Sequence, residues 1–320
     1  MDRRSFLGLG LGAAALSAVP KDLLAGGEVV QKIALGGPLG VADSELLGKV
    51  KFTKLQIDVG AKKPFKVIHC SDSHLNQMNV SDLIAAKRAS DLGMFVHRRG
   101  EMSGSVENLA ACVLKARLEN IPLIHTGDVW DYHSEANFQL AADAFGAAGE
   151  VLYAMGNHEI WGHWEHEPNL DNEGVRRRCD KHLPNRSLFC AKTFGGVNFV
   201  AFDNCQVFGE LHAKLHSRIK KEFAKGLPTV LVMHMPILTE ESRAYCLKGK
   251  EGAADNLRYL LYGVLDEDRE LVKWCCAQPN FKAVLCGHFH KEIQWKISET
   301  VTQYVAGAVY KGNAYEITFV

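Results

Sequence analysis

The chain has 320 residues, of which 47% are hydrophobic and 23% are charged. This length and balance are typical of a soluble protein with one large α/β domain, with or without a short appendage. Lys and Arg together number 37, as do Asp and Glu, so the formal net charge is zero; no global field attracts a polyanion, which argues against a long nucleic acid as partner.

Residues 1–26 are predicted to be a signal segment for export. Arg3 and Arg4 precede an apolar run rich in Gly, Ala and Leu, and this order resembles a twin-arginine signal. The run is shorter than the ~20 apolar residues that span a bilayer, and the alternative is a short N-terminal helix. We therefore expect an exported, periplasmic protein in which residues 27–320 form a single domain.

Strands and helices alternate along the chain from residue 66 onward. Ser105 is expected to cap one helix and Ser134 to open a second, because apolar residues recur after both with helical spacing. This alternation predicts a layered α/β fold. The predicted strands are residues 51–59, 66–70, 122–125, 150–155, 198–203, 229–233 and 282–286, with further short strands in 294–320.

The nine cysteines are predicted to be mostly structural thiols. An odd number cannot all pair within one chain, and the sequence has no Cys-x-x-Cys pair. Cys70 and Cys286 end predicted core strands, where Cys usually acts as a small buried hydrophobic residue. A disulfide between Cys179 and Cys190 is left open.

Residues of the types that bind metals follow five of the predicted strands. In open α/β sheets the loops at the carboxyl ends of strands meet in one crevice, so we expect these side chains to converge. The residues are Asp72, His74, Asp128, Asn157, His234, His288 and His290.

The residue types suit a pair of divalent ions. Imidazole nitrogen and carboxylate oxygen are ligands for manganese, iron and zinc, and the spacing of Asp72 and His74 lets both side chains grip one ion. A carboxylate such as Asp128 can bridge two ions. Ions ~3.5–4 Å apart can clamp a phosphoryl group and turn bound water into hydroxide. We expect two divalent ions, with Mn, Fe and Zn all open as their identity.

The order of the motifs resembles the signature of the calcineurin-like metallophosphoesterase family. Asp-x-His, Gly-Asp, Gly-Asn-His-Glu, His and Gly-His-x-His occur in this order within residues 66–290, each after a predicted strand. One such element alone is common by chance, whereas the series of five is specific. The resemblance implies an α/β/β/α sandwich of two mixed sheets flanked by helices.

The resemblance also implies a role for each site residue. One ion would be held by Asp72, His74, Asp128 and His290, and the other by Asp128, Asn157, His234 and His288, with Asp128 as the bridge. His158 is expected to face the leaving oxygen as a general acid or hydrogen-bond donor. Asp131 resembles the carboxylate that orients this histidine.

Two departures narrow the subfamily. Protein Ser/Thr phosphatases continue the second motif with Asp-Arg-Gly, where this chain has Asp131-Tyr132-His133. Purple acid phosphatases carry Tyr at the position of Asp131. The best remaining resemblance is to the broad bacterial phosphodiesterase-like group, whose substrates vary.

Other polar residues near the motifs can be explained by structural roles. His69 and His125 lie within apolar strands and are predicted to be core histidines. His133 is left between a substrate contact and a surface position, and Glu159 between support of the preceding histidine and the start of the next segment. Asp203 is expected to form an Asx turn.

Two further groups are left open between function and packing. The side chains of Trp161, His163, Trp164 and His166 either wall a pocket or pack within a loop. The run 176–178 of three arginines either binds a phosphate or is solvated, and solvation is favoured.

The expected reaction is hydrolysis of a small phosphomonoester or phosphodiester, in which a metal-bound hydroxide attacks phosphorus and His158 assists the leaving group. One alternative is a nuclease or nucleotide phosphodiesterase. Another is a non-catalytic interaction module on the same scaffold, which the complete ligand set argues against. Specificity is expected to lie in residues 76–104, 159–190 and 237–265, which lack a core pattern.

Overall fold

The structure, a computed structural model, describes residues 41–79, 82, 100–161, 172–205, 207, 209–248 and 253–320. The predicted signal segment lies outside the described residues, as do the side chains of Trp161, His163, Trp164 and His166. Within these described ranges no helix is long and apolar enough to cross a membrane.

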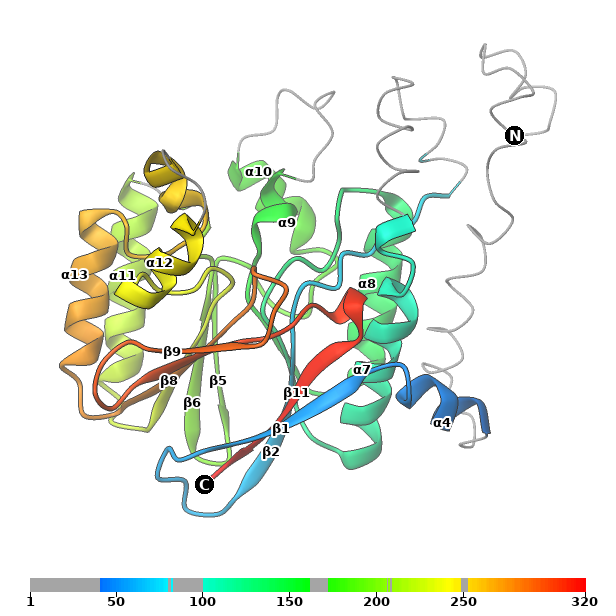
Figure 1. Ribbon diagram of the computed structural model, residues 1–320, viewed down its shortest axis with the longest axis horizontal. Helices are drawn as coiled ribbons and strands as arrows, with labels where there is room; N and C mark the ends of the chain where they lie inside the picture. The colour runs from blue at the N-terminus through cyan, green and yellow to red at the C-terminus, as the bar shows by residue number, and fades with distance from the viewer. Residues whose placement is uncertain are drawn as a thin grey trace, which may run out of the picture.

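The first sheet contains five strands in the order β1-β11-β2-β3-β4. Its strands are β1 (Lys51–Ile57), β2 (Phe65–Cys70), β3 (Leu123–His125), β4 (Val151–Tyr153) and β11 (Asn313–Phe319). β2, β3 and β4 run parallel, so their carboxyl ends meet at one edge. β11 is parallel to β1 and antiparallel to β2, and Figure 1 shows this red strand between the two blue ones.

The second sheet contains six strands in the order β5-β6-β7-β8-β10-β9. They are β5 (Phe189–Phe194), β6 (Val197–Phe202), β7 (Thr229–Val232), β8 (Phe281–Cys286), β9 (Ile293–Lys296) and β10 (Thr302–Val305). β6, β7, β8 and β10 are parallel, and the two outer strands are antiparallel to their neighbours. Both sheets are therefore mixed, as predicted.

Helices cover the outer faces of the two sheets, which pack against each other through a shared core (Figure 1). α7 (Ser105–Glu119) and α8 (Glu135–Ala148) pack on the first sheet. α11 (Gly209–Phe223) and α13 (Asp266–Cys276) pack on the second. The shorter helices are α4 (Val41–Leu47), α9 (Asn157–Trp161), α10 (Asn172–Cys179), α12 (Glu240–Leu247), η2 (Ala253–Tyr259) and η3 (Val309–Lys311). This arrangement is the predicted α/β sandwich of two mixed sheets flanked by helices.

The core between the sheets follows from the side-chain alternation of the strands. Successive side chains along a strand point to opposite faces of the sheet. Val67 of β2 therefore faces the core between the sheets, whereas Ile68 faces the core that contains α7. Both side chains are completely buried, and burial of such a side chain contributes about 1.5–3 kcal/mol. The strands are rigidly held on both faces, which gives the loops at their ends fixed starting points.

The predicted elements were right in kind, with one helix cap confirmed and two differences in detail. Ser134 caps α8, because its side chain accepts a hydrogen bond from Asn137 N at 3.0 Å. Ser105 was wrongly expected to cap α7: it is the first helical residue, and Gly104 occupies the cap position without a side-chain bond. Strand β5 was missed because only two of its six residues, Phe189 and Phe194, are buried.

All nine cysteines are free thiols. Cys70 and Cys286 are completely buried, as predicted for small hydrophobic residues. The disulfide left open between Cys179 and Cys190 is not formed. Cys179 is buried instead beside His133, with its sulfur 3.9 Å from the ring Nε2.

Candidate metal centre

All seven predicted ligands lie together where strands of the two sheets end. The backbone joins their loops, because Asp72 N donates to Gly127 O at 2.9 Å. Gly287 N likewise donates to His234 O at 3.0 Å. Five of the seven are buried and the two C-terminal histidines are partly exposed: Asp72, His74, Asp128, Asn157, His234, His288 and His290.

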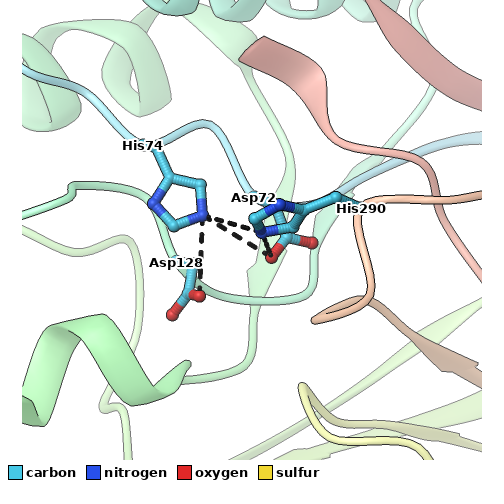
Figure 2. A group of neighbouring side chains, drawn as sticks. All are labelled: Asp72, His74, Asp128 and His290. Carbon is cyan, nitrogen blue, oxygen red and sulfur yellow. Dashed lines mark hydrogen bonds and ion pairs between the residues drawn. The ribbon is translucent and has the colours of Figure 1, made fainter. Parts of the chain in front are cut away.

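One cluster consists of Asp72, His74, Asp128 and His290, which point toward one another in Figure 2. His74 Nε2 lies 3.1 Å from His290 Nε2, 3.8 Å from Asp72 Oδ1 and 3.7 Å from Asp128 Oδ2. His290 Nε2 lies 3.3 Å from Asp72 Oδ1. Ligands about 2.0–2.1 Å from one ion are separated from each other by about 3.0–3.4 Å, so these spacings fit a single ion with small adjustments.

A second cluster consists of Asp128, His234 and His288. His234 Nε2 lies 3.2 Å from Asp128 Oδ2 and 3.2 Å from His288 Nδ1. Asn157, turned so that its Oδ1 faces the ring, lies 3.0 Å from the same nitrogen. The second cluster and Asn157 together are the four residues that the family resemblance assigns to the second ion.

The surroundings of His234 are suited to a cation. The other ring nitrogen, Nδ1, lies 2.7 Å from Thr126 O, a carbonyl that only accepts. A proton on Nδ1 leaves Nε2 as a lone pair that faces the oxygens of Asp128 and Asn157. A positive ion can interact favourably with this lone pair and both oxygens at once.

The pKa values of His234, Asp128 and Asp72 are consistent with a site that favours positive charge. Burial alone lowers the pKa of His234, but the charge of Asp128 and its hydrogen bond outweigh burial and raise that pKa to about 10. Burial likewise opposes ionisation of Asp128, yet the charge of His234 holds the pKa of Asp128 well below its usual range. Both carboxylates of the centre stay ionised, because the hydrogen bond and charge of His290 similarly lower the pKa of Asp72 against burial.

Asp128 is common to both clusters. Its Oδ2 lies 3.7 Å from His74 Nε2 and 3.2 Å from His234 Nε2. Its other oxygen, Oδ1, accepts a hydrogen bond from His158 N at 2.8 Å. The carboxylate is thus fixed by one oxygen and faces both clusters with the other, which fits a dinuclear metal site.

The backbone at the ligands is strained in a consistent way. Six non-glycine residues among the described ones have positive φ, and five of these are predicted ligands. A left-handed conformation is uncommon for residues with a Cβ and costs on the order of 1–3 kcal/mol. The five are Asp72 (φ 55°), His74 (φ 46°), Asp128 (φ 54°), His288 (φ 75°) and His290 (φ 56°). Strain gathered at one site indicates a functional site rather than a packing solution.

Two glycines let the loops of the centre approach each other closely. A Cβ on Gly156 would lie 2.2 Å from Asp128 Oδ1. A Cβ on Gly287 would lie 1.8 Å from Ser71 Oγ and 2.6 Å from Asp72 Oδ2. Any larger residue at either position would displace a carboxylate of the centre.

The family sequence model described as calcineurin-like phosphoesterase matches residues 65–292, a range that begins with β2 and ends just beyond His290. The chain belongs to the calcineurin-like phosphoesterase family. The match spans most of the chain and includes every residue of the two clusters. A search of curated proteins found no match.

Several solved structures are similar to this family member. A dimetal phosphatase from Danio rerio is 13% identical, with 77% of this chain matched to 88% of that one at a TM-score of 0.42. A calcineurin-like phosphoesterase from Bacillus subtilis is 12% identical, with coverages of 77% and 82% and a TM-score of 0.37. A 5'-nucleotidase from Candida albicans is 14% identical with a TM-score of 0.40; 82% of this chain spans 48% of that protein.

In this phosphoesterase, Asp131 contacts two histidines at the edge of the first cluster. Its Oδ1 lies 3.2 Å from His158 Nδ1 and 3.3 Å from His74 Nδ1. Its backbone carbonyl lies 3.0 Å from His158 Nδ1 as well. The sequence anticipated the first contact but not the second. Asp131 therefore orients the ring of a predicted ligand in addition to that of His158.

The His158 side chain lies between the first cluster and solvent. Its ring packs edge-on against His74 at 4.7 Å, and 26% of its side chain is exposed. Burial alone lowers the pKa of His158, but the charge of Asp128 and the bonds to Asp131 outweigh it and raise that pKa to about 9 in the metal-free chain. The charge of Asp128 and the contacts with Asp131 thus favour the protonated form of the ring.

Glu159 supports the bridging loop, a role that sequence reasoning left undefined. Its completely buried carboxylate accepts three backbone hydrogen bonds, from Asp128 N at 2.9 Å, Val129 N at 2.6 Å and Gly156 N at 2.8 Å. Burial and the charge of Asp128 raise the pKa of Glu159 to about 7. The carboxylate thus holds together the loops that contain Asp128 and Gly156 and fixes the position of Asp128.

Glu159→Gln should lower the free energy of unfolding by about 1–3 kcal/mol, because the amide group presents a donor to at least one buried N–H. Urea unfolding measures this change. Glu173→Gln is the matched control, because 69% of the Glu173 side chain is exposed in a surface pair with Arg177, and a change within about 0.5 kcal/mol is expected there. Equal stabilities of the two variants would contradict the supporting role.

Tyr310 is a neighbour of the centre that the sequence did not reveal. Its hydroxyl lies 3.2 Å from His290 Nδ1, and its ring packs edge-on to His74 at 5.5 Å. Tyr310 lies in η3, outside the motifs that contain His74 and His290. No spacing rule links it to the ligands, so only the folded chain could identify it.

Other polar residues proved to be structural. His69 and His125 are completely buried and bond to Thr126 and Ser73, as expected of core histidines. His133 is only 1% exposed, so the surface interpretation was wrong; its Nε2 lies 2.8 Å from the backbone oxygen of Glu159.

The three arginines do not form one phosphate-binding group. Arg176 is buried in an ion pair with Asp203, with an N–O distance of 2.7 Å. Arg177 pairs with Glu173 on the surface, and Arg178 lies 3.7 Å from Glu135. Asp203 also accepts from Cys205 N at 2.8 Å, which is the predicted Asx turn.

Proposed function

We propose that this phosphoesterase hydrolyses a small phosphomonoester or phosphodiester at a dinuclear centre of divalent ions. The observation that carries the proposal is the pair of His and Asp clusters that share Asp128. When bound, two ions would neutralise phosphoryl charge and supply a water nucleophile of lowered pKa. Manganese, iron and zinc all suit these nitrogen and oxygen ligands.

The chain's own residues divide between holding ions and handling a proton. Asp72, His74 and His290 face one ion position, and Asn157, His234 and His288 face the other, with Asp128 directed at both. His158 contacts no carboxylate of the first cluster through its Nε2. It therefore keeps that N–H for the leaving oxygen, as a general acid or a donor to developing charge.

Loss of the Asp131 charge should move the pH dependence of kcat. His158 is proposed to act when protonated, so activity falls as the pH rises through its pKa. Asp131→Asn removes an interaction that raises the pKa of His158, and the basic limb of the profile should shift to lower pH by about 1 unit or more. An unchanged basic limb in a variant that retains its metals would contradict the role of Asp131.

The direct test is metal removal. Protein purified without a chelating tag should contain about two transition-metal ions per chain, and its turnover of nitrophenyl phosphomonoesters and phosphodiesters should disappear on chelation and return with Mn²⁺. Loss of one ion on His288→Ala would support the second position. Full metal loading without turnover of any phosphoester would instead favour the non-catalytic scaffold.

The preferred ester is proposed to be small. The zero net charge offers no general attraction for a polyanion, which disfavours a nuclease for long polymers and leaves nucleotides as candidates. Segments 76–104, 159–190 and 237–265 are proposed to select the substrate. Exchange of one segment should change the ratio of diester to monoester turnover, whereas an unchanged ratio for all three would reject this assignment.

We also propose that the enzyme acts after export by the twin-arginine route. The support is the order of Arg3, Arg4 and the apolar run within residues 1–26. Arg3→Lys with Arg4→Lys should retain the full chain in the cytoplasm. Export of that double variant at the normal level would overturn the proposal.

A further inference from the structure

A further group of side chains of the types that bind metals lies away from the candidate dinuclear centre, between α11 and α13. His212 and His216 are four residues apart on α11, a spacing that places both rings on one face of the helix. Asp268 faces them from the first turn of α13. The two helices lie side by side on the outer face of the second sheet (Figure 1).

The three side chains of this group lie close together and are mostly buried. His212 Nε2 lies 2.6 Å and His216 Nε2 3.6 Å from Asp268 Oδ1, and the imidazole centroids are 3.9 Å apart. All three potential ligand atoms lie within 4.8 Å of one another. The side chains of the three residues are only 12%, 13% and 9% exposed. Small movements of the rings would place all three atoms around one ion.

The group opens onto a pocket. A cavity of about 430 Å³ is lined by His212, Asp268 and Tyr262, among other residues, and this volume falls within the range of small-molecule sites. Two histidines and one carboxylate are a three-ligand set for Zn²⁺, whose fourth position stays open to water or an added ligand. The cavity provides room for that fourth ligand.

We propose that His212, His216 and Asp268 bind a single divalent transition-metal ion of the zinc type, independently of the dinuclear centre. Both histidines present Nε2 to the same carboxylate oxygen, and no mechanism described above uses any of the three residues. Magnesium and calcium should not compete, because imidazole ligands favour transition metals over these ions.

The competing explanation is a hydrogen-bond network without a metal. Asp268 accepts from His212, and the Tyr262 hydroxyl lies 3.1 Å from His216 Nε2. Such a network also holds the two helices together. The two explanations differ in one measurable quantity, which is the number of zinc ions bound per chain.

The experiment uses the full chain in an Asp128→Asn background, so that failure of the dinuclear centre cannot be confused with failure of this site. Protein equilibrated with micromolar free Zn²⁺ is analysed for zinc per chain before and after His216→Asn is added. We expect the zinc content to fall by one ion per chain, and thermal stabilisation by Zn²⁺ at this site to be lost.

Asp268→Asn should remove the same ion and gives a second reading if the His216 variant folds poorly. His182→Asn is the matched control, because this histidine stacks on Phe138 far from the group, and it should leave zinc content unchanged. Equal zinc content in the background protein and in both site variants, with circular dichroism showing native folds, would establish the hydrogen-bond network and overturn the proposal.

Discussion

Asp128→Asn should lower kcat for phosphoester hydrolysis by on the order of 10³-fold or more. The carboxylate faces both clusters through one oxygen, and an amide cannot supply a bridging anion. Loss of several kcal/mol of charge stabilisation by the ions corresponds to such a factor, since each 1.36 kcal/mol is tenfold in rate. The measurement is kcat with saturating Mn²⁺, together with metal content per chain.

Asp143→Asn is the matched control for this substitution. Asp143 lies on the surface of α8, where it accepts a hydrogen bond from Gln139 at 2.8 Å, and the substitution should leave both kcat and metal content unchanged. If the Asp128→Asn enzyme binds two ions per chain and has nearly the parent kcat, Asp128 is not a bridging ligand of the centre.

His158→Ala should reduce kcat by about 10²–10⁴-fold for esters with poor leaving groups. The reason is that an alcohol or unsubstituted phenol needs a proton or a strong hydrogen bond as the P–O bond breaks, and His158 is the proposed donor. Nitrophenol leaves as a stable anion and should suffer a much smaller loss. The measurement is the dependence of kcat on leaving-group pKa, which should steepen in the variant.

Metal content separates this role from metal binding. His158→Ala should retain both ions, because the ring touches the first cluster only by edge-on packing against His74. The His182→Ala variant provides a histidine control outside the centre. A rate loss equal for all leaving groups, or loss of an ion, would show that His158 holds the site together rather than assisting departure.

The convergence of the candidate ligands was predictable from the sequence because each lies shortly after a strand. Strand ends are local features, and the rule that carboxyl ends of parallel strands share an edge converts them into a site. Contacts that depend on tertiary packing were not predictable in the same way. Tyr310 meets His290 only through the fold, and Glu159 meets Asp128 and Val129 across a turn.

The backbone conformation of the ligands also lies beyond sequence reasoning. Asp72 and His74 were expected to leave an extended strand with their side chains on one face, yet both adopt left-handed φ. Propensity disfavours this conformation, and the surrounding loops impose it through bonds such as His74 N to Asp128 O at 3.0 Å. Functional sites are where local preference and global structure are expected to conflict.

The position of β11 has a consequence for biosynthesis. Residues 313–319 pair with residues 51–57 on one side and, through 315–319, with residues 65–69 on the other. A ribosome-bound chain that lacks β11 holds β1 without its hydrogen-bonding neighbour and β2 with β3 alone. Pairings of such large sequence separation form slowly. The loop that follows β2 and carries Asp72 and His74 therefore starts from a complete sheet only after β11 has been synthesised.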